Sequence, residues 1–218
     1  MERTLLSRRR WLLGGTAAAA ALGVAGRPTA TMARLALTPR QGAGPFYPLE
    51  LPLERDADLA SVEGAKGPPA GTITHVAGRV LDTDGRPIRD ALVEIWQANA
   101  FGRYHHPGDR SGGPIDPNFQ GYGQTVTNDD GAYRFRTIRP VPYSRRAPHI
   151  HFTVAGRGFD KLITQMYIEG ERANERDFLL SAVRDPAARR RLIVPLEPAP
   201  DRETGALLGR FDIVIARS

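Results

Sequence analysis

The chain has 218 residues, of which 41% are hydrophobic and 25% charged, and it contains no Cys. Its length fits one domain with an extension, and the lack of Cys excludes disulfides, thiolate nucleophiles, Cys-type zinc sites and iron–sulfur clusters. Most of the formal net charge of +6 comes from Arg residues within residues 1–33, so the rest of the chain carries too little positive charge to indicate nucleic-acid binding.

Residues 1–33 are typical of an export signal. Consecutive Arg residues at 8–10 precede a modestly apolar run from Trp11 to Ala25, which is shorter than the roughly 18 to 20 residues of a membrane span. The order Ser-Arg-Arg-x-Trp-Leu-Leu resembles the twin-arginine consensus. We therefore expect export by the twin-arginine route to the periplasm or the outside, with removal of this segment and no stable membrane insertion of the mature chain. An ordinary secretory signal and a short amphipathic anchor are the alternatives.

Residues 34–218 are expected to form one domain, which begins with an ordered arm over residues 34–71. The arm contains the turn cluster Gly-Ala-Gly-Pro-Phe-Tyr-Pro at 42–48 and shows little sustained periodicity. We expect it to wrap the core that the later residues build.

From residue 72 on, the sequence predicts short strands separated by turns. In the stretch 91–97, Val93 and Ile95 alternate with Glu94 and Trp96, which places the two pairs on opposite faces of a strand. The other strand candidates are residues 72–81, 132–136, 149–154, 161–168 and 209–215.

One short helix is expected near the C-terminus. Asp185 can cap it, Pro186 fits its first turn, and the helical pattern continues to Leu192. Many short strands and a single short helix favour an all-β fold, an antiparallel β-sandwich with long loops and the N-terminal arm.

His149 and His151 are the strongest metal-ligand candidates. On a strand, residues two apart point to the same face, so the two imidazoles can converge on one ion while Ile150 faces the core. A surface strand can also carry two His residues without a metal. A zinc hydrolase that uses the pair is a further alternative, although no carboxylate lies at the spacing expected of its general base.

Tyr104 and Tyr143 add two phenol oxygens to this candidate set. Tyr143 lies on a Pro-rich loop shortly before His149, and Tyr104 follows the strand candidate 91–97. A highly charged cation readily displaces a phenol proton, so the pair can bind as phenolates. Two phenolates and two imidazoles would suit ferric iron and leave a position for solvent or substrate, whereas either Tyr alone would more simply be a packing residue.

Several motifs, in the same order, resemble the intradiol ring-cleavage dioxygenases, most of all the iron-bearing β subunits of the protocatechuate-cleaving branch. They include Val-Glu-Ile-Trp-Gln-Ala-Asn-Ala at 93–100 and Pro-His-Ile-His-Phe at 148–152. The others lie at 76–80, 102–104, 116–119, 135–138, 163–167 and 210–214. The similarity runs from about residue 72 to residue 215 and is more specific than a His-x-His pair.

The resemblance implies a non-haem Fe(III) site with four protein ligands and hydroxide in a fifth position. Tyr104 and His151 match the family's equatorial ligands, and Tyr143 and His149 match the axial ones. In the family, the axial Tyr leaves the iron and accepts a proton when the substrate binds.

The resemblance also implies the groups around the substrate. Arg146 matches the Arg that stabilises negative charge in the substrate ring, and Gln165 matches the polar residue beside it. Residues 44–47, including Pro45 and Tyr47, match the part of the arm that lines the substrate pocket.

The implied reaction cleaves a small catecholic aromatic, protocatechuate-like or catechol-like, between its two hydroxylated carbons. Both atoms of O2 enter the product, a diacid of the cis,cis-muconate type. A homo-oligomer is compatible with this reading.

Two features depart from the family pattern. The loop 144–148 is short and lacks an aromatic residue, which changes the expected pocket shape. Arg145 could attract a substrate carboxylate or be a solvated surface charge. An exported, non-catalytic β-sandwich binding module is the alternative function, and it predicts no iron.

Overall fold

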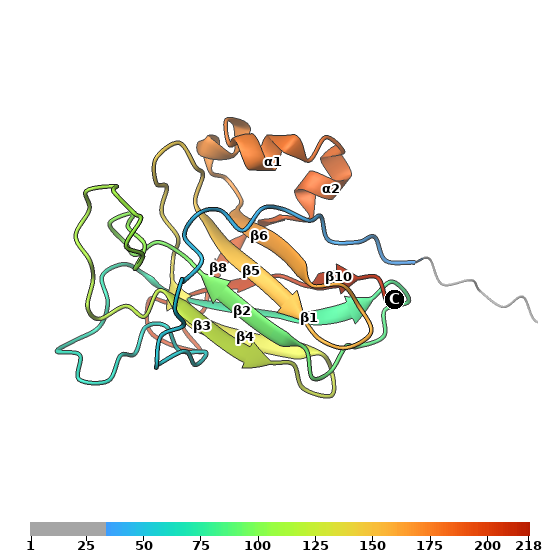
Figure 1. Ribbon diagram of the computed structural model, residues 1–218, viewed down its shortest axis with the longest axis horizontal. Helices are drawn as coiled ribbons and strands as arrows, with labels where there is room; N and C mark the ends of the chain where they lie inside the picture. The colour runs from blue at the N-terminus through green and yellow to red at the C-terminus, as the bar shows by residue number, and fades with distance from the viewer. Residues whose placement is uncertain (1–33) are drawn as a thin grey trace, which may run out of the picture. The chain divides into compact units, whose positions relative to one another are not determined.

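The computed structural model describes residues 34–218, so the predicted export signal lies outside the described residues. Two five-stranded sheets form a β-sandwich (Figure 1). The first sheet has the strand order β10-β1-β9-β8, with β4 also paired to β1, and the second has the order β3-β2-β5-β6-β7. The strands are β1 (Ile73–Asp82), β2 (Leu92–Trp96), β3 (Tyr122–Val126), β4 (Ala132–Ile138), β5 (His149–Ala155), β6 (Leu162–Ile168), β7 (Ile193–Val194), β8 (Leu196–Pro198), β9 (Leu207–Arg210) and β10 (Ile213–Ile215).

The expected all-β sandwich is confirmed, and its sheets are mixed. β1 pairs antiparallel with β4 but parallel with β9 and β10, and β6 pairs parallel with β7. The remaining partners of the second sheet are antiparallel.

The expected strand at 209–215 is divided between β9 and β10. The interruption falls at Phe211 and Asp212, where the chain passes very close to Gly78 of β1. A Cβ at Gly78 would lie 2.0 Å from the carbonyl oxygen of Phe211, so only glycine permits this approach. The side chain of Asp212 then accepts a hydrogen bond from the Arg79 backbone N–H at 2.8 Å, in place of a regular ladder bond.

The register of the second sheet places the predicted site residues side by side. Trp96 of β2 is opposite His151 of β5, and His151 is opposite Gln165 of β6. His149 is opposite Tyr167. Because side chains alternate along each strand, all five residues share one face of the sheet.

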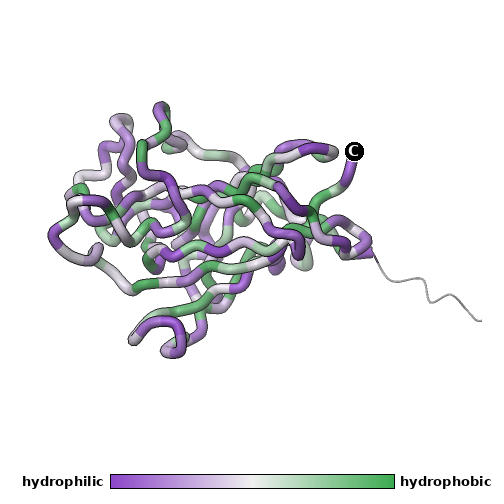
Figure 2. The backbone as a smooth tube through the Cα atoms, turned by 90° about the horizontal axis from the view of Figure 1, so that it is seen from below, coloured by the Kyte–Doolittle hydropathy of each residue, from purple (hydrophilic) through white to green (hydrophobic). Residues whose placement is uncertain are grey.

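The opposite faces of the strands build the hydrophobic core. Figure 2 shows short hydrophobic and hydrophilic segments alternating along the chain, as expected for strands with one buried face. Side chains that are completely buried in this core include Val93, Ile95, Ile150, Phe152, Val154 and Met166.

The N-terminal arm crosses the molecule from one end of the strands to the other. The Leu35 N–H donates to Thr83 O beside the turn after β1, and the Gln41 N–H donates to Ile163 O of β6. Farther on, Gly44 lies against His151. This arm is the blue segment that runs over the second sheet in Figure 1.

Three short helical segments, rather than one, precede β7. They are η1 (Arg172–Glu175), α1 (Phe178–Ala182) and α2 (Pro186–Arg190). α2 has Asp185 as its N-cap and Pro186 in its first turn, as predicted, but it ends at Arg190. Leu192 is completely buried instead and leads into β7. Among residues 34–218, no helix is long and apolar enough to cross a membrane.

Candidate metal centre

The structure brings the four predicted ligands together. The Nε2 atoms of His149 and His151 are 3.1 Å apart, and His151 Nε2 is 3.1 Å from the Tyr104 hydroxyl oxygen. The ring of Tyr143 lies 5.1 Å from that of Tyr104 and 5.4 Å from that of His149, measured between centroids. Two imidazole nitrogens and two phenols therefore surround one small region.

Local structure fixes each tyrosine differently. Tyr104 is buried, and its backbone N–H donates to Asp109 Oδ2 at 2.7 Å, which anchors the loop after β2. Tyr143 is only partly buried and begins a tight turn, which is closed by a 2.9 Å hydrogen bond from the Arg146 N–H to Tyr143 O. Ser144 within this turn has a φ of 51°, a conformation that L-residues rarely adopt.

The two histidines present Nε2 atoms to the region, and that of His149 is unprotonated. His149 Nδ1 donates to Ala147 O at 2.6 Å, which leaves Nε2 as a free acceptor. Burial, with a smaller effect of Arg146, lowers the pKa of His149 to about 4. Burial also lowers the pKa of His151, followed by the effects of His149 and Arg146. Both imidazoles are therefore neutral, the form that binds metals.

This donor set fits a metal ion. Ligand atoms about 2 Å from one ion and roughly at right angles lie about 3 Å apart, close to the distances between these donors. An ion would also satisfy the lone pairs of two buried imidazoles that face each other. Residues 34–218 contain no group of three or more His, Cys, Asp or Glu able to hold a metal, so a metal bound by the two histidines would take its remaining protein donors from the phenols. Burial raises the pKa of Tyr104, and a bound cation would be needed to hold it as phenolate.

Arg146 lies beside this donor cluster in a fixed orientation. Its side chain is 7% exposed, and its Nη2 donates to Gln165 Oε1 at 2.7 Å. Gln165 Nε2 in turn donates to Gly42 O at 2.8 Å, so the predicted Arg–Gln pair is connected to the arm.

Two contacts of Arg146 were not predicted from the sequence. Nη2 also donates to the Tyr167 hydroxyl at 2.9 Å, and Nε donates to Asp177 Oδ2 at 2.7 Å. Tyr167 stands two residues after Gln165 on β6, and this period of two could have revealed it. Asp177 precedes Phe-Leu-Leu-Ser-Ala, a pattern that indicates only a helix cap.

Residues 44–46 of the arm lie beside the donor cluster. A Cβ at Gly44, where φ is 69°, would lie 3.3 Å from His151 Cε1, so this close approach requires glycine. Pro45 is exposed next to it. The Phe46 ring, absent from the predicted set, is 4.9 Å from the Tyr104 ring and 6.1 Å from the Tyr143 ring.

Tyr47 turns away from the metal ligands toward Glu94. Its hydroxyl donates to Glu94 Oε1 at 2.8 Å, and its ring meets Trp96 edge-on at 5.0 Å. Tyr122 and Thr153 also donate hydroxyl hydrogen bonds to this buried carboxylate. Burial opposes ionisation of Glu94, but these hydroxyls outweigh it and lower its pKa. A charged residue within the apolar pattern of β2 was the only sequence signal for this cluster.

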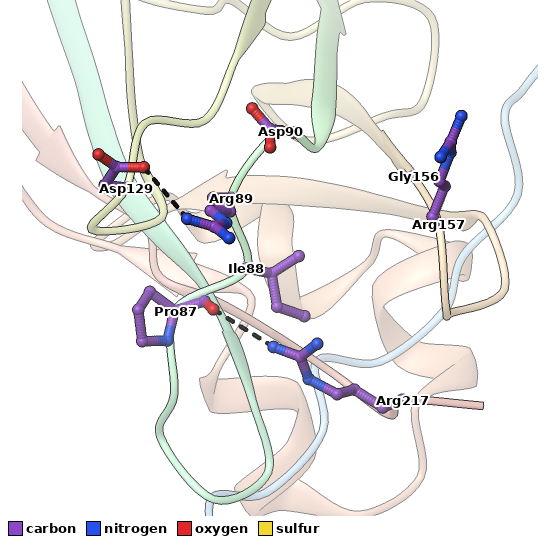
Figure 3. Close-up of a pocket in the computed structure, with 8 residues that line it drawn as sticks. All are labelled: Pro87, Ile88, Arg89, Asp90, Asp129, Gly156, Arg157 and Arg217. Carbon is purple, nitrogen blue, oxygen red and sulfur yellow. Dashed lines mark hydrogen bonds and ion pairs between the residues drawn. The ribbon is translucent and has the colours of Figure 1, made fainter.

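Arg145 and the pocket in Figure 3 lie outside the donor cluster. Arg145 occupies the exposed turn between Tyr143 and Arg146. The pocket in Figure 3 is lined by segments at the opposite ends of the strands, and it contains the Arg89–Asp129 ion pair at 3.7 Å. None of the predicted site residues lines that pocket.

The chain is similar to known dioxygenases. A family model described as "Dioxygenase" matches residues 43–217. The β chain of protocatechuate 3,4-dioxygenase from Burkholderia cepacia is 40% identical over 196 residues, or 86% of this chain and 83% of that protein. Catechol 1,2-dioxygenase 2 from Acinetobacter lwoffii is 34% identical over 178 residues, or 70% of this chain and 62% of that protein.

A solved structure is similar in fold. The dioxygenase domain of a dioxygenase and carbohydrate-binding protein fusion from Streptomyces sp. SirexAA-E has a TM-score of 0.65 and is 28% identical. The match covers 84% of this chain and 100% of that domain.

Proposed function

Because this chain belongs to the intradiol ring-cleavage dioxygenase family, we propose that it is a non-haem Fe(III) enzyme that cleaves a catecholic aromatic with O2. The observation that carries this proposal is the convergence of Tyr104, Tyr143, His149 and His151 beside a fixed Arg146. The product is a diacid of the cis,cis-muconate type. The substrate is catechol-like or protocatechuate-like, as in the named relatives.

Tyr104, Tyr143, His149 and His151 would hold the iron. When bound, ferric iron supplies a Lewis acid that lowers the pKa of the catechol hydroxyls and draws electron density from the ring. The two neutral imidazoles bind without losing a proton, whereas each phenol must become phenolate. Imidazole is a donor that suits iron, and a hard anionic phenolate oxygen suits its ferric form.

The different settings of the two tyrosines support Tyr143 as the proton acceptor. Tyr104 is buried and its backbone is anchored by Asp109, so it stays in place. Tyr143 is partly exposed on a tight turn, so its side chain is less enclosed than that of Tyr104. Tyr143 therefore accepts a proton from a substrate hydroxyl, which requires an acceptor within hydrogen-bond reach.

Arg146 acts on the charge of the substrate. A catechol that has lost its protons is anionic, and a guanidinium held rigidly in a buried site stabilises this charge without reorganising. Gln165 orients Arg146. The arm residues Pro45 and Phe46 form the adjacent wall that excludes water and limits the ring that can enter, and Tyr47 anchors this part of the arm to Glu94.

The test combines metal content, colour and turnover. Iron-loaded protein should contain about one ferric ion per chain and absorb visible light through phenolate-to-iron charge transfer. With catechol or protocatechuate offered separately, it should consume one O2 per diacid formed. His149→Ala and His151→Ala should lose iron. A colourless protein fully occupied by zinc, or coloured protein that consumes no O2 with any catechol, contradicts the proposal. Zinc occupancy would favour the zinc-hydrolase alternative, and a protein that binds no metal would favour the binding module.

We also propose twin-arginine export of this enzyme, on the support of the Ser-Arg-Arg-x-Trp-Leu-Leu segment. Relatives include both β and α chains of protocatechuate 3,4-dioxygenases, and this favours an oligomer. Size-exclusion chromatography of the chain expressed alone tests whether it assembles with itself.

A further inference from the structure

We infer that Asp177 is a positioning residue that holds the Arg146 guanidinium in the orientation needed for turnover. This inference rests on the proposed function, because that function gives Arg146 its role. Asp177 lies far from both the ligands and Arg146 in sequence, at the start of α1, and nothing in the family resemblance marks it.

The Asp177 carboxylate is completely buried and uses both oxygens. Oδ2 accepts from Arg146 Nε at 2.7 Å and from the Ala147 N–H at 2.9 Å. Oδ1 accepts from the N–H groups of Leu179 and Leu180 at 3.1 and 2.9 Å, which caps α1. Burial opposes ionisation, but hydrogen bonds led by that from Arg146 lower the pKa of Asp177, so it forms a buried ion pair.

These contacts determine which face of Arg146 is available. Asp177 occupies Nε, while Gln165 and Tyr167 occupy Nη2. The ring of Phe178, the first residue of α1, packs 5.3 Å from the guanidinium carbon. No acceptor for Nη1 is found among the described residues, so this nitrogen is left for the substrate.

Asp177 also reaches a predicted ligand through the backbone. The Ala147 N–H donates to Asp177, and the Ala147 carbonyl accepts from His149 Nδ1 at 2.6 Å. One carboxylate therefore fixes both the guanidinium and Ala147, the residue whose carbonyl orients the His149 ring.

The position specifically requires a carboxylate. Four N–H groups point at its two oxygens, and an amide of the same shape offers only one acceptor oxygen. In Asp177→Asn, two N–H donors would face an NH2 group, and Arg146 would lose its counter-charge. A shift of about 1 Å in a reacting geometry can cost about 100-fold in rate.

Asp185→Asn is the matched control. Asp185 caps α2 through the N–H groups of Ala187 and Ala188, as Asp177 caps α1, but it is exposed and has no arginine partner. The experiment measures iron-loaded wild type, Asp177→Asn, Asp185→Asn, Arg146→Met and the Asp177→Asn/Arg146→Met double variant.

Asp177→Asn should lower kcat by about tenfold to 100-fold, while the dissociation constant for catechol in the absence of O2, followed by the visible spectrum, changes little. Asp185→Asn should turn over like wild type. In the Arg146→Met background, Asp177→Asn should change kcat by no more than about twofold, because a residue that acts through Arg146 has nothing left to position. Asp177→Glu, which keeps the charge, should recover part of kcat.

Equal losses of kcat from Asp177→Asn with and without Arg146 would overturn the inference, and so would full activity of Asp177→Asn. If Asp177→Asn does not fold, Asp177→Glu tests the inference instead. The Glu side chain is longer, so normal kcat in Asp177→Glu would contradict tight positioning of Arg146. Thermal unfolding of the same variants separates this failure from failure of the proposed function. If wild type cleaves no catechol, the proposed function is wrong. A loss of thermal stability in Asp177→Asn that disappears in the Arg146→Met background would still show that Asp177 holds Arg146.

Discussion

The Trp96 indole lies flat against the His151 imidazole, with ring centroids 4.7 Å apart and planes 7° from parallel. This stacking matters because His151 Nδ1 is buried and has no hydrogen-bond partner among residues 34–218. His149, by contrast, is oriented by its bond to Ala147 O. The two predicted histidine ligands are thus held in different ways, one by a hydrogen bond and the other by packing.

Trp96→Leu should therefore weaken iron binding through His151. Loss of a group that orients a ligand typically costs about tenfold to 100-fold in metal affinity. Competition with a chelator measures this, and Trp96→Phe, which keeps an aromatic face, should retain most of the affinity. Equal iron affinity in Trp96→Leu and wild type would show that the stacking has no orienting role.

Tyr143→Phe should separate iron binding from turnover. The ring volume remains, and three ligands can still hold the iron, but the proton acceptor is lost. We expect iron to be largely retained, the visible band to change, and kcat to fall by about 100-fold or more. Stopped-flow spectroscopy and iron analysis measure these effects, with Tyr104→Phe, which should lose iron, for comparison. Normal colour and turnover in Tyr143→Phe would reduce this residue to a packing role.

Tyr47→Phe should loosen the arm over the site. It removes one of three hydroxyl hydrogen bonds to the buried Glu94 carboxylate, which should lower the free energy of unfolding by about 1–2 kcal/mol. Because the arm carries Gly44 and Phe46 to the ligands, kcat/KM should also fall. Thr164→Val, which removes the 2.8 Å bond to Pro39 O nearer the start of the arm, is the control and should keep wild-type turnover. The same kcat/KM in both variants would contradict a role of Tyr47 at the site.

The metal-free protein should become less stable in acid because of His149. Its pKa is about 4 in the folded chain and about 6.5 when unfolded. Above about pH 6.5 the residue is neutral in both states and has no pH effect. Between about pH 6.5 and about pH 4 only the unfolded chain takes up the proton, so the free energy of unfolding falls by about 3 kcal/mol across this range. Urea unfolding at pH 7 and pH 4.5 measures this fall, which should be smaller in His149→Phe. Equal pH dependence in the two proteins would show that His149 titrates normally.

Replacement of both Arg8 and Arg9 by Lys should stop export. A twin-arginine transporter would recognise the arginine pair as an address, so without it active enzyme should accumulate inside the cell. Activity in the cytoplasmic and external fractions measures the effect. Secretion equal to that of wild type would place the segment with ordinary secretory signals.

Local sequence pattern predicted the elements whose signals are self-contained. β2 and β5 were recognisable because alternation along one strand is visible in a few residues, and α2 because Asp185 and Pro186 are local signals. β3 was missed because its residues, Tyr-Gly-Gln-Thr-Val, have no clear alternation and form a strand through pairing with β2. The division of β9 from β10 depends on Gly78, more than 130 residues earlier in the chain.

The same distinction applies to the site. The His149 and His151 pair follows from strand geometry, and the family resemblance supplied Arg146 and Gln165. Asp177 and Glu94 were missed because their roles arise from partners brought together only by the fold. Thr153 and Glu94, for example, are 59 residues apart.

The arm has a consequence for the order in which the protein is built. Thr38 accepts from the Val214 N–H and donates its own N–H to Val214 O, across 176 residues. The arm is the first described segment to be synthesised, yet the partner of Thr38 does not exist until β10 has been synthesised. This end of the arm can dock only on a finished chain, and pairings this distant in sequence are slow to form.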